Sequence, residues 1–141
     1  MTKEEKQRRF DLFESYDDFN RHNGLRLVDV DDGTSVVEVT LRKEGLNPHG
    51  IAHGGLIFTL CDVATGVAAR TGGRNTVSQD ASIYFLRPGT NTEKLTAKGR
   101  VIKEGRTTGY AEAEVYTDDG KLIAKAAVTV HYIDGKPKTI L

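Results

Sequence analysis

The segment from Gly54 to Arg70 constrains the fold of this chain most. Apolar residues lie on nearly all sides of a helix drawn through it, and Asp62 is the one formally charged side chain between His53 and Arg70. A helix that is apolar all round is normally buried inside a protein. We therefore expect a buried helix at about 54–70, with the rest of the chain built around it.

Most of the remaining sequence alternates apolar and polar residues with a period of two, which is typical of strands with one buried face. Two such stretches flank the turn Asp31–Thr34 and predict a β-hairpin before the helix. The stretches expected as strands after the helix are 77–86, 94–103, 107–117 and 122–133. Strict alternation in the first of these places one set of side chains together on one face, namely Val77, Gln79, Ala81, Ile83 and Phe85. The pattern as a whole predicts an α+β fold with a helix packed on one face of an antiparallel sheet.

The two ends of the chain have different characters. Residues 3–18 carry Phe10 and Phe13 at helical spacing among alternating charges, so residues 1–20 are expected to contain an amphipathic helix that packs on the rest. Residues 134–141 form a polar tail that we expect to fray. A length of 141 residues matches one domain, so 1–141 is expected to be a single domain.

Charge and cysteine content exclude several classes of function. Lys and Arg total 20 and Asp and Glu total 20, so there is no net charge to attract nucleic acid or an anionic membrane. No stretch approaches the roughly 20 apolar residues of a membrane span, and the charged start lacks the apolar region of a secretory signal. A single cysteine, Cys61, excludes a disulfide framework. We expect a cytoplasmic protein with neither nucleic acid nor membrane as a partner.

The start of the buried helix is a candidate binding site for an oxyanion. Residues 45–55 are rich in Gly, Asn, Pro and His, which indicates a loop leading into the helix. Gly54 and Gly55 fall in the first helical turn, where backbone N–H groups lack intrahelical partners and the helix dipole is positive. Because glycine has no Cβ, an oxygen can approach these donors closely. A Gly-Gly pair is also common at an ordinary helix start, so both interpretations stay open.

Asp62 is the second candidate. An ionised carboxylate that is buried without a partner costs several kcal/mol, so Asp62 must be paired, protonated or directed into a cleft. Small or polar residues share a stripe of the helix with it, namely Gly55, Thr59 and Thr65, which suggests that one face is left open. Such an aspartate suits a general base or a nucleophile. It also suits a structural role in which the backbone or an arginine satisfies it.

Two other kinds of site are disfavoured. His49 and His53 are four residues apart and with Asp62 could be imagined as metal ligands, but Pro48 and Gly50 break the helix that would align the two imidazoles. We therefore expect no metal. The sequence also lacks a G-x-S-x-G elbow, which argues against a serine hydrolase of that type.

The run from Asn47 to Asp62, NPHGIAHGGLIFTLCD, resembles the signature of hotdog-fold thioesterases of the phenylacetate-pathway (PaaI) type. The segments 85–89 (FLRPG) and 105–106 (GR) are also similar to that family, so the resemblance covers about 24–132. It implies a hotdog fold, in which a curved antiparallel sheet wraps around one long helix, and hydrolysis of acyl-CoA or aryl-CoA thioesters. It further implies a homo-oligomer, a dimer or dimer of dimers, with sites shared between subunits. CoA would enter as part of the substrate, with no other cofactor.

The resemblance also implies roles for individual residues. Asp62 matches the catalytic carboxylate of the family, and the Gly54 amide matches the donor that polarises the thioester carbonyl. His53 and Asn47 match residues that help to hold this carbonyl and shape the loop, facing the aspartate of the other subunit. Ser78 corresponds in position to a serine that in some relatives orients the attacking water.

Thr65, beside Ser78 in that comparison, completes the implied set. The six candidate site residues are therefore Asn47, His53, Gly54, Asp62, Thr65 and Ser78.

Two other functions remain open. A non-catalytic acyl-CoA-binding or regulatory hotdog protein would keep the fold and lose the reaction, which retention of Asp62 disfavours. A dehydratase acting on acyl-CoA or acyl-carrier substrates would resemble a different pattern, such as a histidine paired with a helix glutamate.

Overall fold

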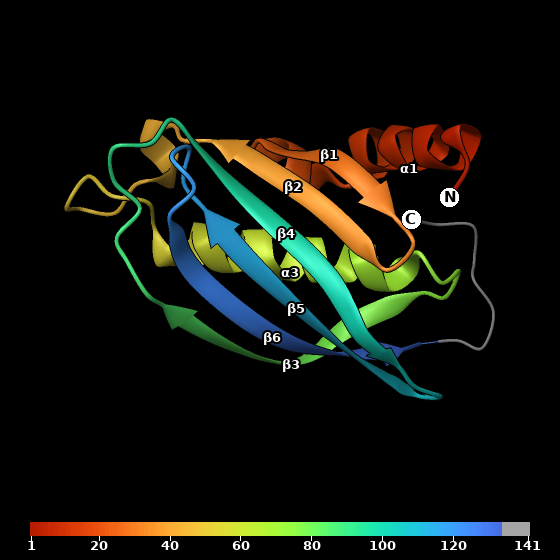
Figure 1. Ribbon diagram of the computed structural model, residues 1–141. Coiled ribbons are helices and arrows are strands. Elements are labelled where there is room, and N and C mark those ends of the chain that lie inside the picture. Colours follow the sequence, from red (N-terminus) through yellow and green to blue (C-terminus); the bar gives the residue numbers. More distant parts are fainter. Residues whose placement is uncertain (134–141) are drawn as a thin grey trace.

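The computed structural model describes residues 1–133, so the expected tail at 134–141 lies outside the described residues. The elements in chain order are α1 (Lys3–Tyr16), α2 (Asp18–His22), β1 (Leu25–Asp31), β2 (Thr34–Thr40), a 3-10 turn (Lys43–Gly45), α3 (Gly54–Arg70), β3 (Thr76–Phe85), β4 (Lys94–Glu104), β5 (Thr108–Tyr116) and β6 (Leu122–Tyr132). The strands form one antiparallel sheet in the order β1-β2-β4-β5-β6-β3. Figure 1 shows this sheet curving around α3, so the expected hotdog architecture is confirmed.

The core lies between α3 and the concave face of the sheet. The long helix is found with the predicted bounds, and Leu60, Cys61 and Ala64 on it have no exposed surface. They pack in a cluster that contains inward-facing side chains of the sheet such as Val37 and Leu95. Complete burial of a side chain like Leu60 contributes roughly 1.5 to 3 kcal/mol. Within residues 1–133, no helix has both the length and the apolar character that crossing a membrane demands.

Helix α3 packs closely on β2 and β4. The hydroxyl of Ser35 on β2 is buried and donates to the carbonyl oxygen of Ala64 at 2.6 Å. Gly99 on β4 lies beside this contact, and a Cβ at that position would be 2.5 Å from the same carbonyl oxygen. The absence of a side chain at Gly99 therefore allows the helix to pack directly on the backbone of the sheet.

The expected alternation of side chains in β3 is wrong at the start of the strand. The register between β3 and β6 shifts at Gln79, which is the extra residue of a β-bulge. As a result Ser78 lies opposite Val130, whose side chain is buried in the core, while Val77 is 48% exposed on the outer face. The bulge thus places Ser78, rather than Val77, on the helix-facing side together with Ala81.

The expected N-terminal helix is interrupted at Asp17. This residue is extended, and its carboxylate caps α2 by accepting hydrogen bonds from the backbone N–H of Asn20 at 3.0 Å and from its side-chain amide at 2.8 Å. Aspartate is a preferred N-cap residue, which explains why a new helix begins here. Helix α1 lies beside β1 (Figure 1). Its Phe13 is buried in the core cluster, and residues of α2 border one cavity together with residues of α3.

The buried position of Cys61 gives a first testable prediction. Burial raises the pKa of its thiol to about 12, and the charge of Asp62 acts in the same direction. Because the thiolate is the reactive form, we expect the native protein not to react with an aromatic disulfide reagent at about pH 8. One equivalent of thiol should react after unfolding in guanidinium. Rapid labelling of the native protein would contradict this packing of α3.

Candidate active site

The first turn of α3 leaves one backbone donor unpaired. His53 is the N-cap residue: its Nδ1 accepts the N–H of Gly55 at 2.8 Å. Its carbonyl oxygen accepts the N–H groups of Leu56 and Ile57 at 3.0 and 3.1 Å. The N–H of Gly54 has no acceptor within the part of the chain that the structure describes. Because it lies at the positive end of the helix dipole, it is the donor available to an incoming oxygen.

The side chain of His53 carries a second N–H donor near the start of α3. Since Nδ1 accepts a hydrogen bond, the neutral imidazole carries its proton on Nε2. The ring is exposed, so this N–H is open to solvent. His53 borders one cavity together with Gly55, whereas Gly54 borders another beside Phe85, so a carbonyl oxygen shared by the two donors stays a prediction.

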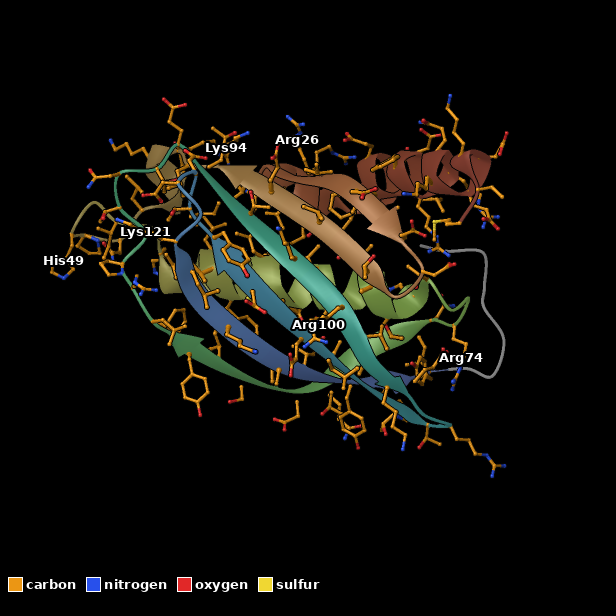
Figure 2. The ribbon with its side chains drawn as sticks, viewed as in Figure 1. Arg26, His49, Arg74, Lys94, Arg100 and Lys121 are labelled. Atoms are coloured by element: carbon orange, nitrogen blue, oxygen red, sulfur yellow. The ribbon has the colours of Figure 1, made fainter. Side chains whose placement is uncertain are left out.

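Asn47 shapes the loop that leads into α3. Its Oδ1 accepts the N–H of His49 at 2.9 Å and that of Ile51 at 3.3 Å. His49 lies at the outer end of this loop and points away from α3, as Figure 2 shows. Among residues 1–133 no group of three or more His, Cys, Asp or Glu is placed to hold a metal ion, and a metal-free site stays a prediction.

Asp62 borders a cavity of about 390 Å³ on the side of α3 that faces α2 and the start of β3. Its Oδ1 accepts a hydrogen bond from the hydroxyl of Ser78 at 2.5 Å. No described residue forms an ion pair with this carboxylate, and it is half-buried. Asp62 is therefore not satisfied by an ion pair with an arginine of the described chain, which was one of the expected alternatives. The bulge at Gln79 brings the Ser78 hydroxyl to this face.

Thr65 is not brought to the cavity. Its side chain is fully buried, and its hydroxyl donates to the carbonyl oxygens of Cys61 at 2.9 Å and Asp62 at 3.0 Å. The open stripe expected from Gly55 through Asp62 to Thr65 instead continues through Gly66 and Arg70, both of which line the cavity.

The side of the cavity opposite α3 was not predicted from the sequence. It is formed by residues of the α2 region, namely Asp17, Phe19 and Asn20. Phe19 is 61% exposed and Phe58 of α3 is 36% exposed, and both border this cavity. The sequence signal for α2 was Asp17, because an aspartate before a short polar segment is typical of the N-cap of a helix.

The sequence and structure together match a known family. A model of the Thioesterase superfamily matches residues 49–124, which is more than half of the chain. The chain belongs to the thioesterase superfamily. The family recognised from the motif residues is thus confirmed, and the matched range contains Gly54, Asp62 and Ser78.

Individual relatives agree with this assignment. The thioesterase chain is 34% identical to "Acyl-coenzyme A thioesterase PaaI" of Escherichia coli (strain K12) over 112 residues, which are 79% of this chain and 80% of that one. The solved structure of E. coli PaaI superposes with a TM-score of 0.85 at 29% identity, covering 94% of this chain and 99% of that one. The structure of smu.793 from Streptococcus mutans UA159 bound to acetyl CoA has a TM-score of 0.76 at 33% identity, covering 81% and 91%.

Proposed function

We propose that this thioesterase hydrolyses acyl-CoA or aryl-CoA thioesters, with Asp62 as general base or nucleophile and the Gly54 amide as the donor that polarises the carbonyl. The observation that carries this proposal is the Asp62 carboxylate, which lines a cavity without a cationic partner while Ser78 holds one of its oxygens. The unpaired Gly54 N–H supplies the electrophilic side. A relative named as an acyl-CoA thioesterase and another solved with acetyl CoA support the substrate class.

The site needs two copies of the chain. Gly54 and Asp62 lie eight residues apart on one helix, about 12 Å along its axis. One chain therefore cannot place this amide and this carboxylate on opposite sides of a single carbonyl group. Strand β3 is at the edge of the sheet, and its exposed apolar residues include Val77, Tyr84 and Phe85. We infer a homodimer in which a second copy covers this edge; the dimer of dimers and the cytoplasmic location remain predictions.

The chemistry follows from this arrangement. The N–H of the partner subunit's Gly54 and the Nε2–H of the partner subunit's His53 hold the carbonyl oxygen as it gains negative charge. Asp62 either takes a proton from a water whose oxygen adds to the carbonyl carbon, or adds directly to give a mixed anhydride that water then cleaves. In both routes the C–S bond breaks and CoA leaves as a thiolate that is protonated. Incorporation of ¹⁸O into Asp62 during a single turnover identifies the anhydride route.

The test is release of free thiol from a panel of acyl-CoA and aryl-CoA esters, with calorimetric binding measured in parallel. We expect turnover of at least one ester class by the wild-type protein. Binding of CoA esters without turnover would favour a regulatory or binding protein instead. Loss of the double bond from enoyl-CoA, with no thiol released, would favour the dehydratase. Light scattering on the same sample should give the mass of an oligomer, and a monomer would contradict the shared site.

Ser78 gives a matched prediction within the same site. Ser78→Ala removes the hydroxyl that donates to Asp62 Oδ1, so the carboxylate loses its fixed orientation. We expect kcat to fall about 10- to 100-fold with a small change in KM. Ser15→Ala is the control, because Ser15 lies exposed on α1, away from β3, and does not line the cavity. Equal kinetics for the two variants would remove Ser78 from the site.

A further inference from the structure

Arg70 is a charged residue of the Asp62 cavity that the proposed reaction does not use. It is the last residue of α3, and it follows Asp62 and Gly66 at intervals of four on the same face of the helix. Helical side chains lean toward the N-terminus, so that of Arg70 runs back over Gly66. A Cβ at Gly66 would lie 3.4 Å from the Arg70 Nη2. Because Gly66 has no side chain, the Arg70 guanidinium has room to lie over it, beside the cavity.

The Arg70 guanidinium has no direct partner. Three arginines of the described chain are not exposed, and the other two, Arg9 and Arg74, donate to backbone carbonyl oxygens. Within residues 1–133, Arg70 forms neither a side-chain hydrogen bond nor an ion pair. Burial lowers the pKa of Arg70, although the nearby carboxylates of Asp17 and Asp62 act against this. An arginine stays protonated in proteins, so a positive charge without a directly bonded carboxylate borders the cavity.

The neighbouring carboxylates form hydrogen bonds with groups other than Arg70. Asp17 accepts hydrogen bonds from Asn20 with both of its oxygens, and Asp62 accepts one from Ser78. Neither approaches Arg70 within ion-pair distance in the part of the chain described. The five N–H donors of the guanidinium therefore remain available to something that enters the cavity.

The two ends of the cavity along α3 differ chemically. Phe58 borders it on the side of Asp62 toward the start of the helix, and Arg70 borders it on the side toward the end. Asp62 lies between these ends. The rise of a helix places Gly66, over which the guanidinium lies, about 6 Å along the axis from Asp62. A short acyl group whose thioester carbonyl is beside Asp62 can thus bring its far end to Arg70.

We propose that Arg70 recognises a carboxylate at the far end of the acyl group, so that the preferred substrates are short CoA esters of dicarboxylic acids. A carboxylate is the planar, bidentate partner that a guanidinium binds best. It would pair directly with the guanidinium and accept hydrogen bonds from its unused donors. This inference rests on the proposed function, because it assumes that the acyl group enters the Asp62 cavity.

The test compares two esters that differ only in the end of the acyl group, glutaryl-CoA and hexanoyl-CoA. Any contact with CoA is common to both, so the ratio of their kcat/KM values reports on the acyl end alone. We expect the wild-type protein to favour glutaryl-CoA by about 50-fold or more, since a site with unpaired polar groups discriminates strongly against an analogue that cannot pair them. Arg70→Gln should lower kcat/KM for glutaryl-CoA about 100-fold, mainly through KM, and leave hexanoyl-CoA within about threefold.

Three comparisons keep the outcome unambiguous. Arg70→Lys keeps the charge without the planar fork and should retain an intermediate preference, which also covers the case in which Arg70→Gln folds poorly. Arg8→Gln removes an exposed arginine of α1 and should change neither ester. Calorimetric binding of both esters to the wild-type protein should show the same preference even if hydrolysis is absent, so failure of the proposed function is distinguishable.

Other results would overturn the inference. If wild-type protein hydrolyses or binds hexanoyl-CoA as well as glutaryl-CoA, Arg70 does not select a carboxylate. If Arg70→Gln weakens both esters equally, the guanidinium acts on CoA or on Asp62. If the substitution dissociates the oligomer, Arg70 pairs across the subunit interface.

Discussion

Asp62→Asn should lower kcat for CoA ester hydrolysis by about three orders of magnitude, within the range that loss of a general base or nucleophile produces. Asparagine has nearly the same shape as aspartate, and its amide oxygen can still accept the hydrogen bond from Ser78. The substitution therefore removes the negative charge while keeping the cavity intact. We expect a smaller change in KM, because the proposed role of this charge is to act on water or on the carbonyl carbon during the reaction. Steady-state thiol release with calorimetric binding separates the two effects.

Asp11→Asn is the matched control for this substitution. Asp11 is an exposed carboxylate of α1, which packs on β1 at the opposite edge of the sheet from β3. It does not line the Asp62 cavity, so its neutralisation should leave kcat within about twofold. Wild-type kcat in Asp62→Asn, with the fold intact by circular dichroism, would show that another group activates water.

Both ends of the central helix could be predicted, because the residues that determine them are close together in the sequence. Residues 54–70 are apolar on nearly all sides, and His53 with the following glycines marks the start. The sequence also singles out Asp62 as a candidate site residue, since a lone carboxylate on such a helix requires an explanation, and its role stays a prediction. Backbone N–H groups at the start of any helix lack intrahelical acceptors, so an unpaired N–H at residue 54 could also be predicted. Because residue 54 is a glycine, no Cβ blocks access to this N–H.

The position of Ser78 could not be predicted from alternation. The bulge at Gln79 depends on how β3 pairs with β6, a contact between segments about 50 residues apart in sequence. Strict alternation placed Ser78 on the face opposite Ala81, whereas the structure places both toward α3. The role considered for Ser78 came from family resemblance, and only the pairing of strands explains its contact with Asp62.

The walls of the cavity are likewise determined by tertiary packing. The sequence indicated one helix up to residue 20, and only the cap at Asp17 turns the following segment toward α3. Arg70 is unremarkable in sequence, because a cation at the C-terminus of a helix is common. Its burial arises from the space over Gly66 and from the packing of α2 nearby, which a linear pattern does not encode.

Gly99→Ala should be the most destabilising single methyl addition in the core. The added Cβ would lie 2.5 Å from the carbonyl oxygen of Ala64, 2.6 Å from its carbonyl carbon and 3.0 Å from the Ser35 Oγ. Backbone atoms of α3 cannot move aside without shifting the whole helix from the sheet. We expect a loss of about 2 to 3 kcal/mol in the free energy of unfolding, the range for overpacking a core. Urea unfolding at a fixed protein concentration measures it, because association also contributes to stability.

Gly109→Ala is the control for Gly99→Ala. It adds a methyl group to a strand without a clash against the backbone of α3. Gly109 lies on the neighbouring strand β5, and its added Cβ would meet the hydroxyl of Tyr132 at 2.6 Å and the Cγ2 of Val130 at 3.1 Å. Both are atoms at the ends of side chains, which can shift at lower cost than a helix backbone. We therefore expect Gly109→Ala to lose about half as much stability as Gly99→Ala, with an unchanged urea m-value in both. Equal losses would mean that α3 moves as readily as a side chain, and the positions of Gly54 and Asp62 would then not be held by the contact between α3 and β4.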